Sequence, residues 1–462
     1  MTLVPSPFSA PLERSDKSPL AKVAIVGRGF TGLMTAIALL KGFARPFHLV
    51  MFDPQPKIDG GAVVNEATAT VLNSRVRDLS VDPTARDDFR QWLETDDARR
   101  GLPDPGAVNV EHSFVSGEIF SAYVYQRFSE ALRDRTDVVI QVCPEIVTAI
   151  DRHPNGGLSV FLGDQERRHF DAVFLATGYG QRERVDEPSL PSAVRNAVVV
   201  GGGVHAVDRA LRLLTAGEAS HITLISASGF LPQSHSPAGV GSVVTDQAIP
   251  GTLRGAFRFL REAANAANAE GTGWQGIMNG FRSRAGDLWR GLTPVERGRF
   301  KRHVKAIYDS HRNRLPPENY QRLQEAIQSG AITVRKGKVE RIATNGVLIA
   351  TSAGIEVLPS DRTIDCRFRP ADFDAPLFRS VFRAGIARRD ELDISILVDQ
   401  CGRAMVSPDR FQGLFAMGPL GLGSLPDIDL VPEIVSQSHG AAAALEVWID
   451  DLAETPDARN SG

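Results

Sequence analysis

The sequence predicts an α/β fold, and three observations lead to that prediction. A short apolar run, a glycine loop and a helix-like stretch follow one another twice, at 23–32 (VAIVGRGFTG) and at 197–208 (AVVVGGGVHAVD). Each copy precedes another apolar run of strand type, FHLVMFD or HITLIS, which completes a β-α-β unit. Between about 250 and 330 the chain is helix-prone and basic in places. We therefore expect two Rossmann-type dinucleotide-binding domains with a helical insertion.

The order of these elements gives the expected domains. Residues 1–20, rich in Pro and Ser and without a continuous apolar run, are expected to be a disordered lead-in rather than a signal peptide. Residues 21–190 hold the first glycine loop and several strands, and a charged, proline-containing linker ends this part. Residues 191–350 form the second domain, with its helical insertion at about 250–330. Residues 351–462 are expected to return to the first domain.

Composition narrows the possible partners and compartment. The 462 residues are 42% hydrophobic and 23% charged, with a net charge of −3, so no basic excess points to nucleic acid or to an anionic membrane. No apolar run approaches the length of a membrane span. Cys143, Cys366 and Cys401 lie far apart, which favours small buried side chains over a disulfide scaffold, a zinc site or a redox dithiol. A soluble, cytoplasmic protein is expected.

The first glycine loop matches G-x-G-x-x-G and predicts a dinucleotide site. The first glycine permits a tight turn, the second a close approach of the backbone to a pyrophosphate, and the third close packing of helix against strand. Phosphates at such a loop sit at the helix N-terminus, where free N–H groups favour negative charge. An acid at the end of the next strand is placed to bind a ribose. The expected cofactor-binding residues here are Gly27, Gly29, Phe30, Thr31, Gly32 and Asp53.

The second glycine loop, Gly201, Gly203 and Ala206, matches G-x-G-x-x-A and predicts a second dinucleotide site. The next strand, however, ends in Ser226-Ala-Ser228, with neither an acid for a ribose diol nor an arginine for a 2′-phosphate. Either the residue that recognises the adenosine ribose lies elsewhere in the chain, or the second fold is vestigial and binds no dinucleotide. Both NADH and NADPH are retained as possible donors.

Further stretches resemble two-dinucleotide flavoproteins, and more narrowly the bacterial FAD/NAD(P)-binding oxidoreductase family with a YdhS-like plan. Phe174–Tyr179 resembles the A-T-G strand between the FAD and NAD(P) domains, and Leu414–Pro419 resembles the late FAD-contacting segment before the last helix. The resemblance spans roughly residues 22–445; other matching stretches are 71–73, 79–80, 225–235, 311–314 and 431–433. It departs at Ala227, where the family has an arginine. The resemblance implies further FAD contacts by Asn73, Thr177, Gly178, Gly418 and Pro419.

Three other features have two interpretations each. The basic stretch at 299–314 is either a solvated helix face or a source of anion-binding side chains, with Arg312 and Arg314 as candidates for a substrate or nicotinamide phosphate. His235 is either a surface-loop histidine or a residue that approaches the active site. Trp274 and Trp289 are expected to serve packing. No histidine spacing indicates a metal site.

The function that follows from the resemblance is an FAD-dependent, NAD(P)H-consuming monooxygenase. Such an enzyme hydroxylates a small molecule with O₂ through a C4a-peroxyflavin; family members suggest a urate-like purine or an amine or amino acid. The cofactor does this chemistry, so no acid–base pair of side chains needs to be visible, and no catalytic residue is assigned. One alternative is a flavin dehydrogenase or reductase without oxygen insertion. Another is a non-enzymatic nucleotide-binding protein with a degenerate second fold.

Overall fold

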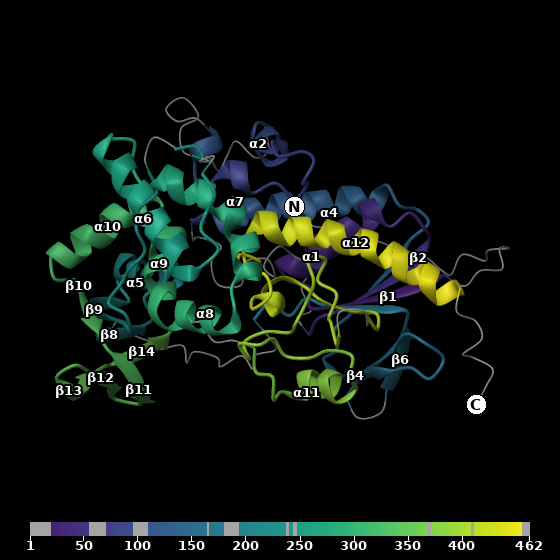
Figure 1. The fold of residues 1–462 in the computed structure, drawn as a ribbon. Helices are drawn as coiled ribbons and strands as arrows, with labels where there is room; N and C mark the ends of the chain where they lie inside the picture. Colours follow the sequence, from purple (N-terminus) through teal and green to yellow (C-terminus); the bar gives the residue numbers. More distant parts are fainter. Residues whose placement is uncertain are drawn as a thin grey trace.

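The computed structural model describes residues 20–54, 71–95, 110–163, 166–179, 194–236, 240–243, 247–367, 371–407 and 411–454. Its framework consists of two parallel β-sheets, each covered by helices on one face and by a small antiparallel sheet on the other (Figure 1). The expected α/β class with parallel sheets is confirmed. The lead-in expected to be disordered lies, up to residue 19, outside the described residues.

The first parallel sheet joins segments from both ends of the chain. Its strand order is β15-β7-β1-β2-β3. The central strand β1 has four fully buried residues at its carboxyl end, which is why it reads as a continuous apolar run rather than an alternating one. The strands are β1 (Ala21–Val26), β2 (Phe47–Phe52), β3 (Val139–Cys143), β7 (Ala172–Leu175) and β15 (Leu414–Ala416).

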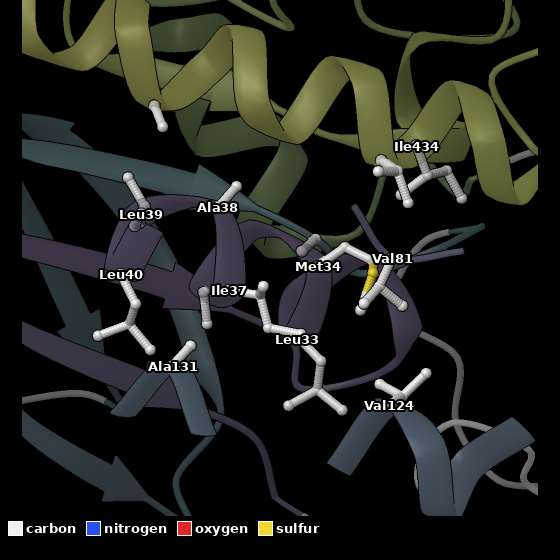
Figure 2. Close-up of a cluster of buried hydrophobic side chains, with 14 of the residues drawn as sticks. Leu33, Met34, Ile37, Ala38, Leu39, Leu40, Val81, Val124, Ala131 and Ile434 are labelled. Atoms are coloured by element: carbon white, nitrogen blue, oxygen red, sulfur yellow. The ribbon is translucent and has the colours of Figure 1, made fainter. Parts of the chain in front are cut away.

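One face of this sheet is covered by three helices, α1 (Phe30–Gly42), α4 (Gly117–Arg133) and α12 (Val431–Glu454). Helix α1 lies between the other two, and its side chains point to both (Figure 2). Every residue from 31 to 40 is buried, which explains why this helix is apolar all round. This packing holds the N-terminus of α1, and with it the first glycine loop, in place.

The opposite face is covered by an antiparallel sheet and a short helix. The sheet comprises β4 (Val147–Arg152), β5 (Leu158–Leu162) and β6 (Glu166–Phe170), and the helix is α11 (Pro376–Arg383). Between β2 and α4 the chain forms the short elements η2 (Val76–Asp78), α2 (Asp88–Leu93) and η3 (Val110–His112).

The second parallel sheet repeats the same arrangement with the order β10-β9-β8-β14. One face carries α5 (Val204–Thr215) and α10 (Pro317–Gln328), and the other carries an antiparallel sheet of three strands. The parallel strands are β8 (Val194–Val200), β9 (Ala219–Ser226), β10 (Ile332–Lys336) and β14 (Arg362–Asp365); the antiparallel ones are β11 (Lys338–Ala343), β12 (Gly346–Thr351) and β13 (Gly354–Pro359).

The end of this unit differs from our expectation. We placed the return to the first domain at residue 351, but β13 pairs with β12, and β14 pairs with β8 at the edge of the second parallel sheet. The sequence of a short strand does not indicate which sheet the strand joins, because that depends on its pairing with a distant segment of the chain. The second unit therefore extends to Asp365.

Besides α10, further helices lie between the second unit's β9 and β10. They are α6 (Leu253–Ala269), α7 (Gln275–Gly291), α8 (Pro294–Arg299), the π-helical turn η4 (Phe300–Val304) and α9 (Lys305–Arg312). Leu260, Met278, Phe281 and Ala285 form a small core between α6 and α7. Trp289 is buried and donates its indole N–H to the carbonyl oxygen of Gly423, 2.9 Å away, so its packing role is confirmed. Among the helices of the described part, none is long and apolar enough to cross a membrane.

Candidate functional site: two glycine loops and the residues between them

The first glycine loop follows β1 at the carboxyl edge of the first parallel sheet. Gly27 has a φ of +102°, and its N–H donates to the carbonyl oxygen of Phe52, 2.8 Å away. A Cβ on Gly27 would lie 2.5 Å from the carbonyl oxygen of Ala176, and a Cβ on Gly32 only 2.0 Å from the carbonyl oxygen of Gly27. Both positions therefore admit only glycine, because strand, loop and helix backbones touch here.

Asp53 and the start of α1 complete this loop. The Asp53 carboxylate accepts a hydrogen bond from the backbone N–H of Arg28, with a distance of 2.7 Å from N to Oδ2. The N-cap of α1 is Gly29, which offers no side-chain cap. Side-chain caps from Ser116, Thr252 and Thr293 begin α4, α6 and α8, whereas α7, α9, α10 and α11 lack one, so the missing cap matters here only together with the glycine loop. An uncapped helix N-terminus beside a glycine loop is the arrangement that binds phosphate.

Two later segments lie against the same loop. Met417 donates its backbone N–H to the carbonyl oxygen of Leu175 (2.8 Å), and Gly418 sits so close to Thr31 that a Cβ would be 2.7 Å from the threonine Oγ1. Gly418 has a φ of +60° and donates its N–H to Gln437 of α12 (2.7 Å). Pro419 follows in the turn η5 (Gly418–Gly421). The predicted residues Thr31, Gly418 and Pro419 are thus brought together.

Thr177 and Gly178 follow β7, directly beside Gly27. A Cβ on Gly27 would lie 3.2 Å from the backbone nitrogen of Thr177, and Gly178 has a φ of +61° with open space at its Cβ position. The Thr177 hydroxyl is buried and has no hydrogen-bond partner among the described residues. A polar atom of this kind at the edge of the loop is suited to a bound polar ligand.

The second glycine loop has the same place in the second unit, and it is crowded at Gly202, where a Cβ would lie 2.5 Å from the Ser226 Oγ. Gly201 has a φ of +142° and donates its N–H to the carbonyl oxygen of Ile225, 2.9 Å away. A Cβ on Gly201 would lie 3.1 Å from the Cβ of Ala206, which is fully buried. Gly203 is the N-cap of α5, offers no side-chain cap, and has no atom of the described residues within 4 Å of its Cβ position. Among the described residues, the space beside Gly203 at the N-terminus of α5 is therefore open.

The strand end beside this loop is occupied by serine. Ser226 donates its hydroxyl to the carbonyl oxygen of Phe230 (2.9 Å) and accepts the N–H of Gly229 (3.1 Å), so it closes its own turn. Lys336, at the end of β10, is in register with Ser226, and its Cδ lies 3.2 Å from the Cβ position of Gly229. Sequence reasoning missed Lys336 because its proximity depends on the pairing of β10 with β9.

His235 lies between the two units rather than on a free surface loop, so the interpretation as a surface-loop histidine is wrong. Its Nε2 lies 2.9 Å from the carbonyl oxygen of Asn73, and its ring contacts Phe114 at 5.0 Å between centroids. Burial, with the positive charges of Arg314 and Arg75, lowers the pKa of His235 to about 3. The imidazole is therefore neutral at physiological pH. Its Nε2–H donates to the carbonyl oxygen of Asn73, and this hydrogen bond links the Asn73 segment to the second unit.

Arg312 and Arg314 are both buried, so for these two the solvated-face interpretation is wrong. Arg312 lies 2.6 Å from Asp427 (Nε to Oδ1) and 2.8 Å from Asp429 (Nη2 to Oδ1). Burial lowers the pKa of Arg312, but the two carboxylates outweigh it and the net shift is upward. Arg312 is therefore committed to an internal ion-pair network. Arg314 has no such carboxylate; it donates to the Asn279 side chain and lies over the Trp274 ring.

The described residues hold no group of three or more His, Cys, Asp or Glu side chains arranged for a metal ion. Cys143, Cys366 and Cys401 are free thiols.

Comparisons with known proteins agree with this geometry. A family model described as FAD-NAD(P)-binding matches residues 24–180, the part that contains the first glycine loop, Asp53 and Thr177. No curated protein matches the chain.

Solved structures match over nearly the whole chain. L-lysine 6-monooxygenase from Pseudomonas syringae has a TM-score of 0.60 at 14% identity, covering 93% of this chain and 100% of that one. Kutzneria ornithine N-hydroxylase, in a structure titled with reduced FAD, NADP⁺ and L-ornithine, has a TM-score of 0.59 at 17% identity, covering 93% and 99%. Bacillithiol disulfide reductase from Staphylococcus aureus has a TM-score of 0.52 at 12% identity, covering 95% and 100%. The expected similarity to FAD/NAD(P) oxidoreductases, amino-acid N-hydroxylases included, is confirmed for the fold.

Proposed function

We propose that this chain is an FAD-dependent oxidoreductase with two dinucleotide-binding domains. FAD would bind the first unit, formed by residues 21–190 and the segment after Asp365, and NADH or NADPH would bind the second, residues 191–365 with its helices at about 250–330. The observation that carries the proposal is the repeated arrangement at the carboxyl edges of both parallel sheets. Gly29 and Gly203 begin α1 and α5 without a side-chain cap, and each follows a strand and a glycine turn.

The residues of the first unit fit FAD. The backbone N–H groups at Gly29, Phe30 and Thr31 would face the pyrophosphate, and Asp53, already bound to the loop through Arg28, would accept from the ribose. Thr177 would use its unpartnered hydroxyl, and the segment 417–419, bound to α12 through Gln437, would contact FAD from the other side of the loop. When bound, FAD supplies the redox chemistry by accepting a hydride from a nicotinamide and reducing O₂ or another acceptor. The protein orients the cofactor and excludes water.

Within this class we favour a monooxygenase that hydroxylates the nitrogen of a small amine or amino acid, and retain a urate-like purine as a second substrate class. The support is the similarity in fold to lysine and ornithine hydroxylases over 93% of the chain. A flavin reductase is the alternative, since a disulfide reductase shares the fold. Its dithiol branch is disfavoured because the sequence contains no Cys-x-x-Cys. A non-enzymatic role would require the second loop to bind no dinucleotide.

One set of assays separates these functions. The purified full-length chain is examined for bound flavin by absorbance, then for oxidation of NADH and NADPH with L-ornithine, L-lysine, cadaverine or urate. Hydroxylated product in proportion to NAD(P)H consumed supports the monooxygenase. NAD(P)H oxidation that yields only peroxide or reduced dye supports the reductase. A chain that takes up no FAD contradicts both enzymatic functions.

A further inference from the structure

Arginine side chains gather where the first unit, the helical segment and the stretch 231–236 meet. Arg75 follows the Asn73 segment, Arg282 is on α7, and Arg314 follows α9. All three charges act on His235, and Arg282 and Arg75 both lower the pKa of Arg314. We call Arg75, Arg282 and Arg314 the arginine cluster.

The two most buried members of the arginine cluster have only neutral partners. Arg75 and Arg314 are each 4% exposed. Arg75 donates to the carbonyl oxygens of His112 and Ser236, whereas Arg314 donates to the Asn279 amide oxygen, and its Nε has no partner. Within the described part of the chain, neither guanidinium forms an ion pair with a carboxylate.

The neighbouring acids compensate the positive charge of the arginine cluster only in part. Glu433 at the start of α12 lies 3.8 Å from Arg282, the member of the cluster on the solvent side. Asp78 lies 3.9 Å from Arg77, and its charge also acts on Arg75 and Arg314, although neither forms an ion pair with it within the described residues. Burial, with the repulsion of Arg282, lowers the pKa of Arg314 to about 10, which still leaves it charged at neutral pH. His235 is neutral, so it neither adds to nor compensates the positive charge of the cluster. Buried cations without a carboxylate in direct contact are costly and are ordinarily paired or bound to a ligand.

Arg312 is a useful comparison, because it is a buried arginine whose charge is compensated by contacts with carboxylates. It lies two residues from Arg314, is similarly buried, and contacts two aspartates. In the described part of the chain, carboxylates therefore contact Arg312 but not Arg314 or Arg75, although all three guanidinium groups are buried. The Arg282 side chain keeps 27% exposure, so the cluster reaches solvent on that side.

We propose that Arg75 and Arg314, with Arg282 at the solvent side, bind an oxyanion, either a carboxylate of the substrate or a phosphate of the nicotinamide dinucleotide. This proposal rests on the proposed function for the identity of the ligands, but not for the existence of the site. Two guanidinium groups of fixed orientation match the geometry of carboxylate and phosphate. The cluster lies beside His235, which contacts Asn73 of the first unit and whose backbone N–H donates to the carbonyl oxygen of Leu315.

The first experiment measures anion binding without catalysis. The thermal midpoint of the full-length protein is followed against added sodium phosphate or sodium acetate, with sodium chloride keeping the ionic strength constant. A ligand that binds only the folded state raises the midpoint. We expect Arg314→Gln and Arg75→Gln to weaken the apparent anion affinity on the order of tenfold or more, and Arg314→Lys to weaken it less.

The matched control is Arg290→Gln, which removes an exposed arginine from the same helix as Arg282. General salt stabilisation acts on all variants alike, so only the difference from this control counts. Equal midpoint increments in wild type, Arg290→Gln, Arg314→Gln and Arg75→Gln would overturn the proposal. A protein without flavin that still shows the anion effect would contradict the proposed function and leave this site standing.

A second arm identifies the source of the anion with matched ligand pairs. NADP⁺ and NAD⁺ differ by one phosphate, and L-lysine and cadaverine differ by one carboxylate. If Arg314→Gln removes the difference in affinity between NADP⁺ and NAD⁺, the site binds the phosphate. If it leaves both dinucleotides unchanged while the anion effect is lost, the site binds a substrate carboxylate, and L-lysine should lose any advantage over cadaverine.

Discussion

The two glycine loops occupy equivalent places in the two units, yet they tolerate different residues. In the first loop, Gly32 touches the Gly27 carbonyl so closely that no side chain fits, and Asp53 is bound to the loop backbone. In the second, the corresponding position is Ala206, Gly203 faces open space, and Ser226 closes its own turn. The first loop is thus a closed cradle of backbone atoms that includes Ala176 at the end of β7, whereas the second loop borders the Ser226 turn at the end of β9.

The largest effect is expected from Gly32→Ala. The new Cβ would lie 2.0 Å from the Gly27 carbonyl oxygen, so α1 must move away from the loop. We expect no bound flavin and a loss of unfolding free energy of about 3 kcal/mol or more. The matched change Ala206→Gly should cost only about 1 kcal/mol and keep flavin. Flavin absorbance and denaturant unfolding check both; a yellow Gly32→Ala protein would contradict the closed cradle.

Asp53→Ala should have the next largest effect. It removes the acceptor of the Arg28 N–H and the proposed ribose partner. The FAD dissociation constant should rise on the order of tenfold to a hundredfold, as expected for charge-assisted hydrogen bonds. Titration of the apoprotein with FAD measures it. Asp53→Asn, which keeps one acceptor, should fall between wild type and Asp53→Ala, and unchanged FAD affinity in both would remove Asp53 from the site.

Gly203→Ala tests whether the second loop binds a dinucleotide. Its φ of −92° and the open space at its Cβ position allow alanine without strain, so flavin content and thermal midpoint should not change. A methyl group at the N-terminus of α5 would hold the pyrophosphate away from the helix N–H groups. We expect KM for the nicotinamide cofactor to rise about tenfold. An unchanged KM would favour the vestigial alternative for the second loop.

The smallest effect is expected from Lys336→Gln. Lys336 is exposed and lies beside the Ser226 turn, where the adenosine end of a dinucleotide would be. If it attracts a 2′-phosphate, the ratio of kcat/KM for NADPH over NADH should fall about fivefold, in keeping with an exposed ion pair. Lys338→Gln, two residues on, provides the control and should leave the ratio unchanged. A ratio that does not respond to Lys336→Gln would leave the arginine cluster as the remaining phosphate candidate.

Much of the first unit could be predicted because its signals are local. The apolar run of β1, the glycines and Asp53 lie within one β-α-β unit, so chain connectivity already brings them together. The boundary at residue 351 was wrong because β14 pairs with β8, more than 150 residues earlier in the chain. Arg75 and Lys336 were missed for the same reason. Neither belongs to a motif, and each becomes a candidate only because a distant segment of the chain folds against it.

The sequence by itself determined the α/β class, the two glycine loops and the helices between about 250 and 330, since periodicity and turn chemistry act over a few residues. Only the tertiary structure decided which arginine contacts a carboxylate. Arg312 and Arg314 stand in one basic stretch and are indistinguishable by composition. Folding places two aspartates from the 427–429 segment on Arg312, and an amide and a tryptophan on Arg314. Charge compensation depends on contacts across more than 100 residues of chain, which is why a linear pattern does not reveal it.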